Sequence, residues 1–322
     1  SVLVKAPHKL LWDQVAIPLA VKREKIELLF HPKHSLPFFV KCKTLMHLRG
    51  SDYWIFPDHF EKFDLMYQKL TLPIFCKKAT HLVVESNFVK QDFKRILKIP
   101  ESKMTMIYLA PSDRFKVITD KKKLSEIQKK YNLPEEFILT VTRIVQGKKY
   151  YAGKNFVNII KGFQESQASQ YIKFVVVGLK TKEFIRDLKL PPNVQRNIVA
   201  LDFVPQEDLP ALYNLASFFL FPSRYESFGI PLAEAMRCGC PVITSNTFAC
   251  PEIVGDAGLL VNPENISEIA GAIDRLHTDV LLRNELRKKG FEQVERFSWE
   301  KSAKQHIQLF EQISREDVII NT

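Results

Sequence analysis

The sequence predicts an α/β protein built from two Rossmann-like domains, and three features of its 322 residues support that class. Continuous apolar runs alternate with helical patterns, which is typical of parallel sheets covered by helices on both faces. The length suits two domains better than one. A composition of 46% hydrophobic and 26% charged residues is typical of a folded globular chain.

The second half of the chain shows the clearer alternation. Strands are expected at residues 137–142, 172–178, 198–204, 218–221 and 241–244. Helices are expected at residues 155–165, 206–216, 267–276 and 299–313. Parallel sheets of this kind bind ligands at the carboxyl ends of their strands.

The first half is also α/β but shorter. Its expected strands are residues 2–4, 27–30, 44–47, 81–84 and 103–108, and its expected helices are residues 10–22 and 87–97. A lysine-rich stretch at 116–123 reads as a hinge between the domains. We therefore expect domains at 1–117 and 118–298, with a last helix at about 299–322 that packs back on the first domain.

The net charge of +11 is concentrated in the first domain, where residues 1–118 hold 20 Lys and Arg against 11 Asp and Glu. This excess indicates an anionic partner such as acidic membrane lipids or a pyrophosphate-linked acceptor, although solubilising lysines explain it equally well. No pattern of basic and aromatic residues indicates nucleic acid. Helix 10–22 has the apolar spacing of a membrane-surface helix, but Pro18 favours packing on its own sheet.

Targeting and metal-binding signals are absent from the sequence. No apolar run reaches the ~20 residues that span a bilayer, and no secretion signal is visible. The five cysteines lack zinc-ligand spacing, which favours reduced thiols in the cytoplasm. We expect a cytoplasmic protein with peripheral contact to acidic membrane through the basic first domain.

The most informative stretch is residues 219–244, which read as a buried strand, a tight loop, a helix that opens with Pro231, a stop at Gly239 and another strand. Gly229 lets backbone amides approach a ligand where a helix N-terminus favours diphosphates. Glu234 is expected in the first helical turn, ionised by the helix dipole. An ionised carboxylate can accept both hydroxyls of a ribose diol.

This order of parts resembles the retaining glycosyltransferases of the GT-B type, family four (glycosyl transferases group 1), whose hallmark is two glutamates separated by seven residues. The resemblance implies that Glu226 faces the donor sugar and Glu234 holds the ribose. It also implies that sugar and phosphate oxygens contact the loop and helix start at Ser227, Phe228, Gly229 and Ile230.

The same resemblance assigns further residues. Arg143 and Lys154 would neutralise the departing diphosphate, although Thr142 replaces the usual glycine and surface charges remain the alternative. Residues Phe203 and Val204 would hold the nucleotide base. His47 would face the donor sugar from the first domain, although Leu48 stands where the family has an aspartate.

The implied function is the transfer of a hexose, with retained configuration, from a nucleoside-diphosphate sugar to a glycan, polysaccharide or lipid-linked acceptor. A UDP-sugar is favoured, GDP-mannose is the second option, and no cofactor or metal is expected. The family normally begins with a strand and a glycine-rich loop before the equivalent of Val2, so the N-terminal domain is expected to be abbreviated. The alternatives are a nucleotide-sugar epimerase or phosphorylase on the same fold, or a non-catalytic nucleotide-sugar-binding subunit.

Overall fold

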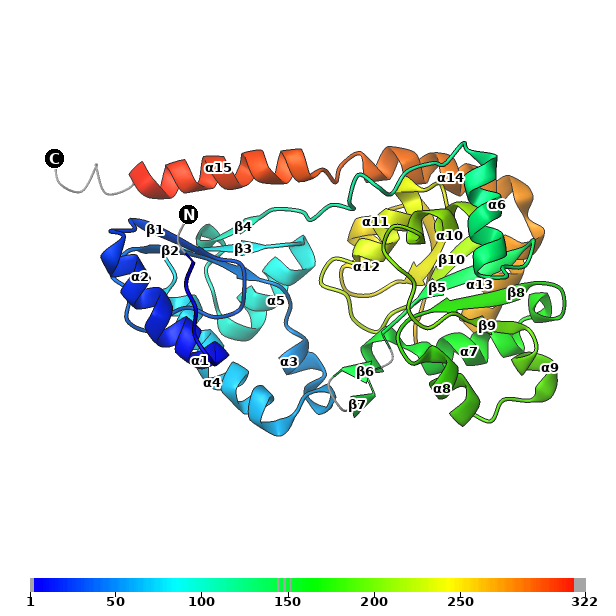
Figure 1. Ribbon diagram of the computed structural model, residues 1–322, viewed down its shortest axis with the longest axis horizontal. Helices are drawn as coiled ribbons and strands as arrows, with labels where there is room; N and C mark the ends of the chain where they lie inside the picture. The colour runs from blue at the N-terminus through cyan, green and yellow to red at the C-terminus, as the bar shows by residue number, and fades with distance from the viewer. Residues whose placement is uncertain (1–2, 144, 147–148, 151, 316–322) are drawn as a thin grey trace. The chain divides into compact units, whose positions relative to one another are not determined.

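The computed structural model describes residues 3–143, 145–146, 149–150 and 152–315. Its contacts divide the chain into two compact units. Unit 1 contains Ser1–Tyr108 and Glu300–Thr322, and unit 2 contains Leu109–Trp299 (Figure 1). The domain limits expected from the sequence stay a prediction.

Unit 1 contains a four-stranded parallel sheet in the order β1-β2-β3-β4. The strands are β1 (Leu28–His31), β2 (Lys43–Leu48), β3 (His81–Val84) and β4 (Met104–Met106). Its α-helices are α1 (Lys9–Leu11), α2 (Ile17–Arg23), α3 (Asp52–Ile55), α4 (Lys62–Lys78), α5 (Asn87–Leu97) and α15 (Trp299–Arg315, in this unit from Glu300). A π-helical turn, η1 (Trp12–Ala16), and two 3-10 turns, η2 (Pro57–His59) and η3 (Glu101–Lys103), complete it.

Alternating residues of these strands pack on opposite faces of the sheet, as the period of a strand requires. Met46 and Val84 pack with α4 and α5, while Leu45 and Val83 pack with Leu309 of α15. Helix α15 therefore covers part of one face of the sheet within unit 1.

One expectation for the first half is wrong, and a second needs detail. Leu3 and Val4 form no strand, and Val2 lies outside the described residues. Leu3 is 79% exposed and pairs with no strand of the described part of the chain. Helix 10–22 exists as α1, η1 and α2, but its apolar positions do not all pack inward. Asp13 is buried instead, near His31 (Oδ1 to Nε2, 3.5 Å). The π-helical turn lies just before Pro18, which lacks the N–H that a regular helix needs there.

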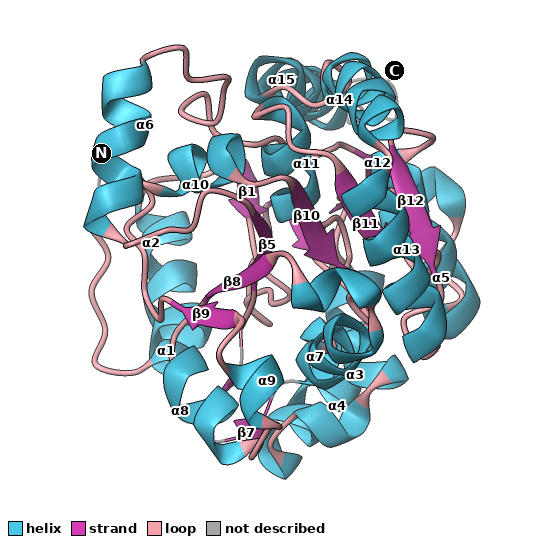
Figure 2. Cartoon of the chain, turned by 90° about the vertical axis from the view of Figure 1, so that its right-hand side faces the viewer, coloured by secondary structure: helices cyan, strands magenta, loops and turns pink. Residues whose placement is uncertain are grey.

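Unit 2 contains a six-stranded parallel sheet in the order β12-β11-β10-β5-β8-β9. The strands are β5 (Phe137–Val141), β8 (Lys173–Val177), β9 (Ile198–Ala200), β10 (Phe218–Phe221), β11 (Val242–Ser245) and β12 (Gly258–Val261). A short antiparallel hairpin, β6 (Val145–Gln146) and β7 (Lys149–Tyr150), follows β5. Figure 2 shows the large sheet between helices on its two sides.

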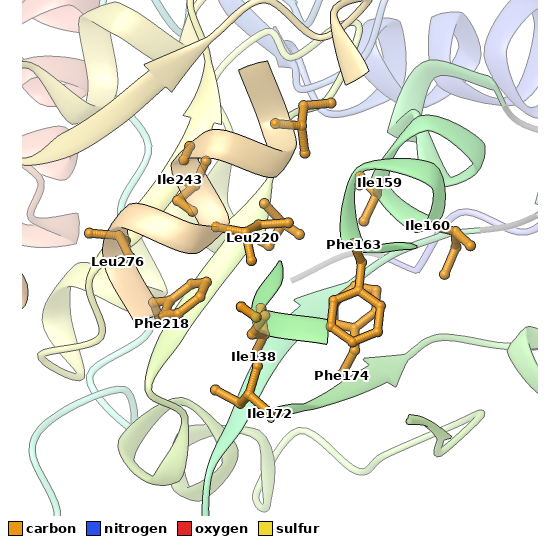
Figure 3. Close-up of a cluster of buried hydrophobic side chains, with 14 of the residues drawn as sticks. Ile138, Ile159, Ile160, Phe163, Ile172, Phe174, Phe218, Leu220, Ile243 and Leu276 are labelled. Atoms are coloured by element: carbon orange, nitrogen blue, oxygen red, sulfur yellow. The ribbon is translucent and has the colours of Figure 1, made fainter. Parts of the chain in front are cut away.

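The helices of unit 2 form two groups. One group contains α6 (Lys121–Lys130), α10 (Leu209–Leu215), α11 (Ile230–Arg237), α12 (Cys250–Val254) and α14 (Val280–Val294). The other contains α7 (Phe156–Glu165), α8 (Thr181–Asp187), α9 (Pro192–Gln195), α13 (Ile266–Thr278) and the 3-10 turns η4 (Ala152–Lys154) and η5 (Gln167–Gln170). Aromatic and branched side chains fill the core between the sheet and the second group (Figure 3). Phe163 of α7 and Phe174 of β8, with ring centres 5.1 Å apart, belong to it.

Candidate active site

The site in unit 2 lies where the order of the strands reverses. From β5 the chain continues through β8 and β9 on one side, then returns to β10, β11 and β12 on the other. Open parallel sheets bind ligands outside the carboxyl ends of the strands that flank such a switch point. Those strands are β5 and β10, and the loops after them carry Lys154 and Glu226.

Asn155 fixes the position of Lys154 at the start of α7. Its Nδ2 donates hydrogen bonds to the carbonyl oxygens of Pro222 (2.9 Å) and Pro263 (2.7 Å), in the loops after β10 and β12. Its backbone is in the left-handed region, with φ of 55°. The N–H of Arg224 donates to the Gly153 carbonyl (2.8 Å). The two loops at the switch point are therefore held together by backbone as well as by side chains.

Lys154 and Glu226 form a buried ion pair. The Nζ of Lys154 lies 2.5 Å from Oε1 of Glu226, and the two side chains are only 14% and 10% exposed. The ammonium also lies 5.0 Å from the centre of the Phe221 ring, a cation–π contact. The structure thus brings together two candidate residues that are 72 positions apart.

Glycine and buried aromatic packing shape the loop before α11. Gly229 precedes the helix with φ of +91°, a conformation that favours glycine because other side chains clash there. Phe228 is buried, with its ring centre 5.3 Å from that of Phe297. Ser227 and Ile230 are half-buried beside it. The backbone of this loop and the helix start could therefore contact a ligand.

Glu234 differs from its expected position and charge state. It is the fifth residue of α11, so it lies beyond the first turn. Burial raises the pKa of its carboxyl to about 7, although the hydroxyl of Tyr213 donates a hydrogen bond to Oε2 (3.3 Å). The loss of hydration therefore outweighs the stabilisation expected from the helix dipole.

The remaining candidates of unit 2 lie at neighbouring strand ends. Arg143 is exposed just after β5. The strand expected to reach residue 204 ends at Ala200, because Asp202 turns the backbone with φ of +47°. Phe203 is 70% exposed, and Val204 is buried. An exposed aromatic ring at a carboxyl edge could stack on a base.

Sequence reasoning missed the buried polar groups at this edge. The Oδ1 of Asn155 and the hydroxyls of Ser223, Thr142 and Thr247 are buried and lack a hydrogen-bond partner in the described part of the chain. Such groups normally bond to protein, water or ligand. The sequence did place these polar residues in the loops after β5, β10 and β11, and that position could have identified them as site candidates. Gly178, just after β8, was a second such signal, because a Cβ there would lie 2.2 Å from the Thr142 carbonyl oxygen.

His47 belongs to unit 1, in β2, and is only 8% exposed. Its Nε2 lies 3.7 Å from Oε2 of Glu85, which follows β3 and was not singled out from the sequence. Burial, with the nearby charge of Arg49, lowers the pKa of His47 to about 4. The imidazole is therefore neutral near pH 7, able to form hydrogen bonds but carrying no charge. His34, its neighbour, has a pKa lowered to about 3, again mainly by burial.

No cluster of three or more His, Cys, Asp or Glu side chains within the described ranges could hold a metal ion. The five cysteines are unpaired thiols. Independence from metal stays a prediction.

The two parallel sheets, with helices on both faces, define the GT-B class of glycosyltransferase folds, and solved structures agree. Sucrose-phosphate synthase from Thermosynechococcus elongatus is similar with a TM-score of 0.75 and 19% identity, over 94% of this chain and 77% of that one. Anabaena HepE in complex with UDP and glucose is similar with a TM-score of 0.74 and 16% identity, over 95% of this chain and 83% of that one.

The chain belongs to the glycosyl transferases group 1, whose family profile matches residues 121–293, more than half of its length. This is the family that the resemblance in the sequence indicated. It is 27% identical over 263 residues to the serotype-specific mannosyltransferase WbdA of Escherichia coli. It is 29% identical over 264 residues to the O-antigen chain mannosyltransferase B of Escherichia coli.

These matches span 81% and 79% of this chain, but only 32% of WbdA and 66% of mannosyltransferase B. The chain thus corresponds to a third of one relative and to just under two thirds of the other. None of the helices in the described part of the chain combines the length and apolar character that crossing a bilayer requires.

Proposed function

We propose that the chain transfers a hexose from a nucleoside-diphosphate sugar to a glycan, polysaccharide or lipid-linked acceptor and retains the anomeric configuration. The observation that carries the proposal is the buried Lys154–Glu226 pair at the switch point of the second sheet. A cation and a carboxylate in the loops that flank this point suit a ligand with an anionic diphosphate and a hydroxyl-rich sugar.

The proposed chemistry needs little beyond positioning and charge. The bond between the anomeric carbon and the leaving phosphate oxygen breaks, and the acceptor oxygen bonds to that carbon on the same face. The acceptor proton passes to the leaving phosphate. Negative charge grows on that phosphate, where Lys154, Arg143 and the amides at the start of α11 would stabilise it. Because these groups supply the positive charge, we expect activity to persist in the presence of a metal chelator.

Glu226 would then orient the donor sugar through hydrogen bonds, and Glu234 would accept the two ribose hydroxyls. Phe203 and the backbone near Val204 would hold the base. His47, neutral at pH 7, would contact the sugar as a hydrogen-bond partner rather than as a charge.

The names of two relatives contain the word mannosyltransferase, which supports GDP-mannose as the first donor to test. A fold neighbour was solved with UDP-glucose, which keeps UDP-sugars in the comparison. A role in polysaccharide synthesis agrees with the O-antigen named for mannosyltransferase B.

The direct test supplies each nucleoside-diphosphate sugar with and without a glycan acceptor, and it determines the anomeric configuration of the product by NMR. We expect nucleotide release only when acceptor is present, and a product with the donor's configuration. Removal of the Lys154 cation should lower kcat about a hundredfold or more. Interconversion of the donor sugar without acceptor would instead identify an epimerase. Donor binding with no turnover across many acceptors would identify a binding subunit.

A further inference from the structure

Helix α4 of unit 1 is apolar on two opposite faces. One face packs Leu72, Phe75 and Cys76 into the core. The other face carries large apolar side chains at intervals of three, four and four residues, which keeps them in one row. They are Phe63, Met66, Leu70 and Ile74, which are 66%, 53%, 63% and 51% exposed. We call this row the α4 stripe; the helix is shown in Figure 1.

The stripe is not what a surface helix needs for folding. A helix that packs on one sheet normally presents polar residues on its outer side. Scattered exposed apolar residues are common, but a continuous row over three turns marks an interaction surface. Phe39, which is 84% exposed, lies near the C-terminal end of the stripe, because Lys78 Nζ bonds to the carbonyl of Phe38.

The charges beside the stripe indicate the chemistry of its partner. α4 carries Lys62, Lys69, Lys77 and Lys78 against one acidic residue, Asp64. Lys69 and Lys77 are exposed, and helical spacing puts them beside Met66, Leu70 and Ile74. A basic, apolar helix face fits the interface of an anionic bilayer: the apolar side chains enter the acyl boundary and the ammonium groups remain among lipid phosphates.

We propose that the α4 stripe and its flanking lysines bind the surface of an anionic lipid bilayer, with α4 lying in the plane of the membrane. The excess of basic residues in the first 118 positions would also attract the chain to an anionic surface. This interaction is independent of the transfer reaction, so either proposal can fail alone. It also assigns the membrane contact to α4 rather than to α1 and α2, where a π-helical turn interrupts the helix.

The test is cosedimentation of the full chain with vesicles of phosphatidylcholine alone or mixed with phosphatidylglycerol. We expect binding to the mixed vesicles that weakens with added salt. The double variant Leu70→Gln with Ile74→Gln, which leaves the charge unchanged, should lower the partition coefficient about tenfold or more. The pair Lys69→Gln with Lys77→Gln should weaken binding to the mixed vesicles only.

The matched control is Val280→Gln with Leu281→Gln, which alters two residues of unit 2 that are 53% and 82% exposed. It should bind as the unaltered chain does. The proposal is overturned if the unaltered chain ignores anionic vesicles, or if the stripe variant binds them equally well. It is also overturned if the stripe variant unfolds at a lower temperature than the control, since the stripe then packs within the chain. A loss of dimer in the variant would identify a second copy as the partner.

Discussion

The ammonium of Lys154 and the carboxylate of Glu226 lie 2.5 Å apart in a largely dehydrated site, although 72 residues separate them. Each neutralises the charge of the other. A diphosphate that enters would compete with Glu226 for Lys154. We therefore expect the pair to link the stability of unit 2 to the binding of an anion.

Replacing Lys154 with alanine leaves the Glu226 carboxylate buried without its partner. The free energy of unfolding should fall by about 3 kcal/mol. Lys161→Ala, at an exposed position of the following helix α7, should change it by less than about 0.5 kcal/mol. Denaturant titrations measure both values. The double variant Lys154→Ala with Glu226→Gln should lose less than the sum of the single losses, and strict additivity would contradict the coupling.

The raised pKa of Glu234 makes stability depend on pH. The unfolded carboxyl titrates near pH 4.5 and the folded one near 7, so the folded state binds more protons between those values. Stability from this group is therefore greatest below pH 4.5 and is lost as the pH rises to 7, by on the order of 3 kcal/mol. In Glu234→Gln that decline should disappear from chemical denaturation curves recorded across the interval. An unchanged profile would contradict the shift.

Buried neutral histidines give unit 1 the opposite dependence on pH. The pKa values of His34 and His47 fall from 6.5 to about 3 and about 4, mainly because of burial. The unfolded chain therefore binds more protons below pH 6.5, and stability is lost as the pH falls from 6.5 to 4. Each group contributes a slope of about 1.4 kcal/mol per pH unit. His47→Gln should reduce the measured slope by that amount, and an unchanged slope would contradict the shift.

Gly229 and Gly271 offer a matched pair of glycine substitutions. Gly229 has a φ of +91°, and a Cβ added there would lie 3.0 Å from Leu232 Cδ1. A Cβ added to Gly271, inside α13, would have no atom within 4 Å. Gly229→Ala should lower the free energy of unfolding by about 1–2 kcal/mol. Gly271→Ala should raise it by about 0.5–1 kcal/mol. Equal effects in thermal unfolding would show that the loop before α11 is not constrained.

Much of the fold could be predicted, because buried parallel strands are continuous apolar runs. β3, β10 and α5 have the predicted bounds. β12 and α4 were not predicted. β12 is only four residues long. Because α4 is apolar on two opposite faces, its sequence lacks the single apolar face, repeating every three or four residues, from which a helix is predicted.

The candidate site could be predicted as a set of residues but not as a geometry. The family resemblance pointed to Glu226 and Lys154, yet their contact depends on Asn155, which bonds to a carbonyl 108 positions away. The burial that raises the pKa of Glu234 arises from tertiary packing, which helix-terminus rules do not include. The partner of His47, Glu85, comes from the next strand of the sheet.

The most direct test of the central claim is calorimetric titration of nucleoside-diphosphate sugars into the unaltered chain, Lys154→Ala and Lys161→Ala. The account predicts saturable binding to the unaltered chain and to Lys161→Ala, and binding weakened at least about tenfold in folded Lys154→Ala. No binding of UDP-, GDP- or ADP-sugars to the unaltered chain, or equal affinity in all three proteins, would contradict a donor site at the Lys154–Glu226 pair.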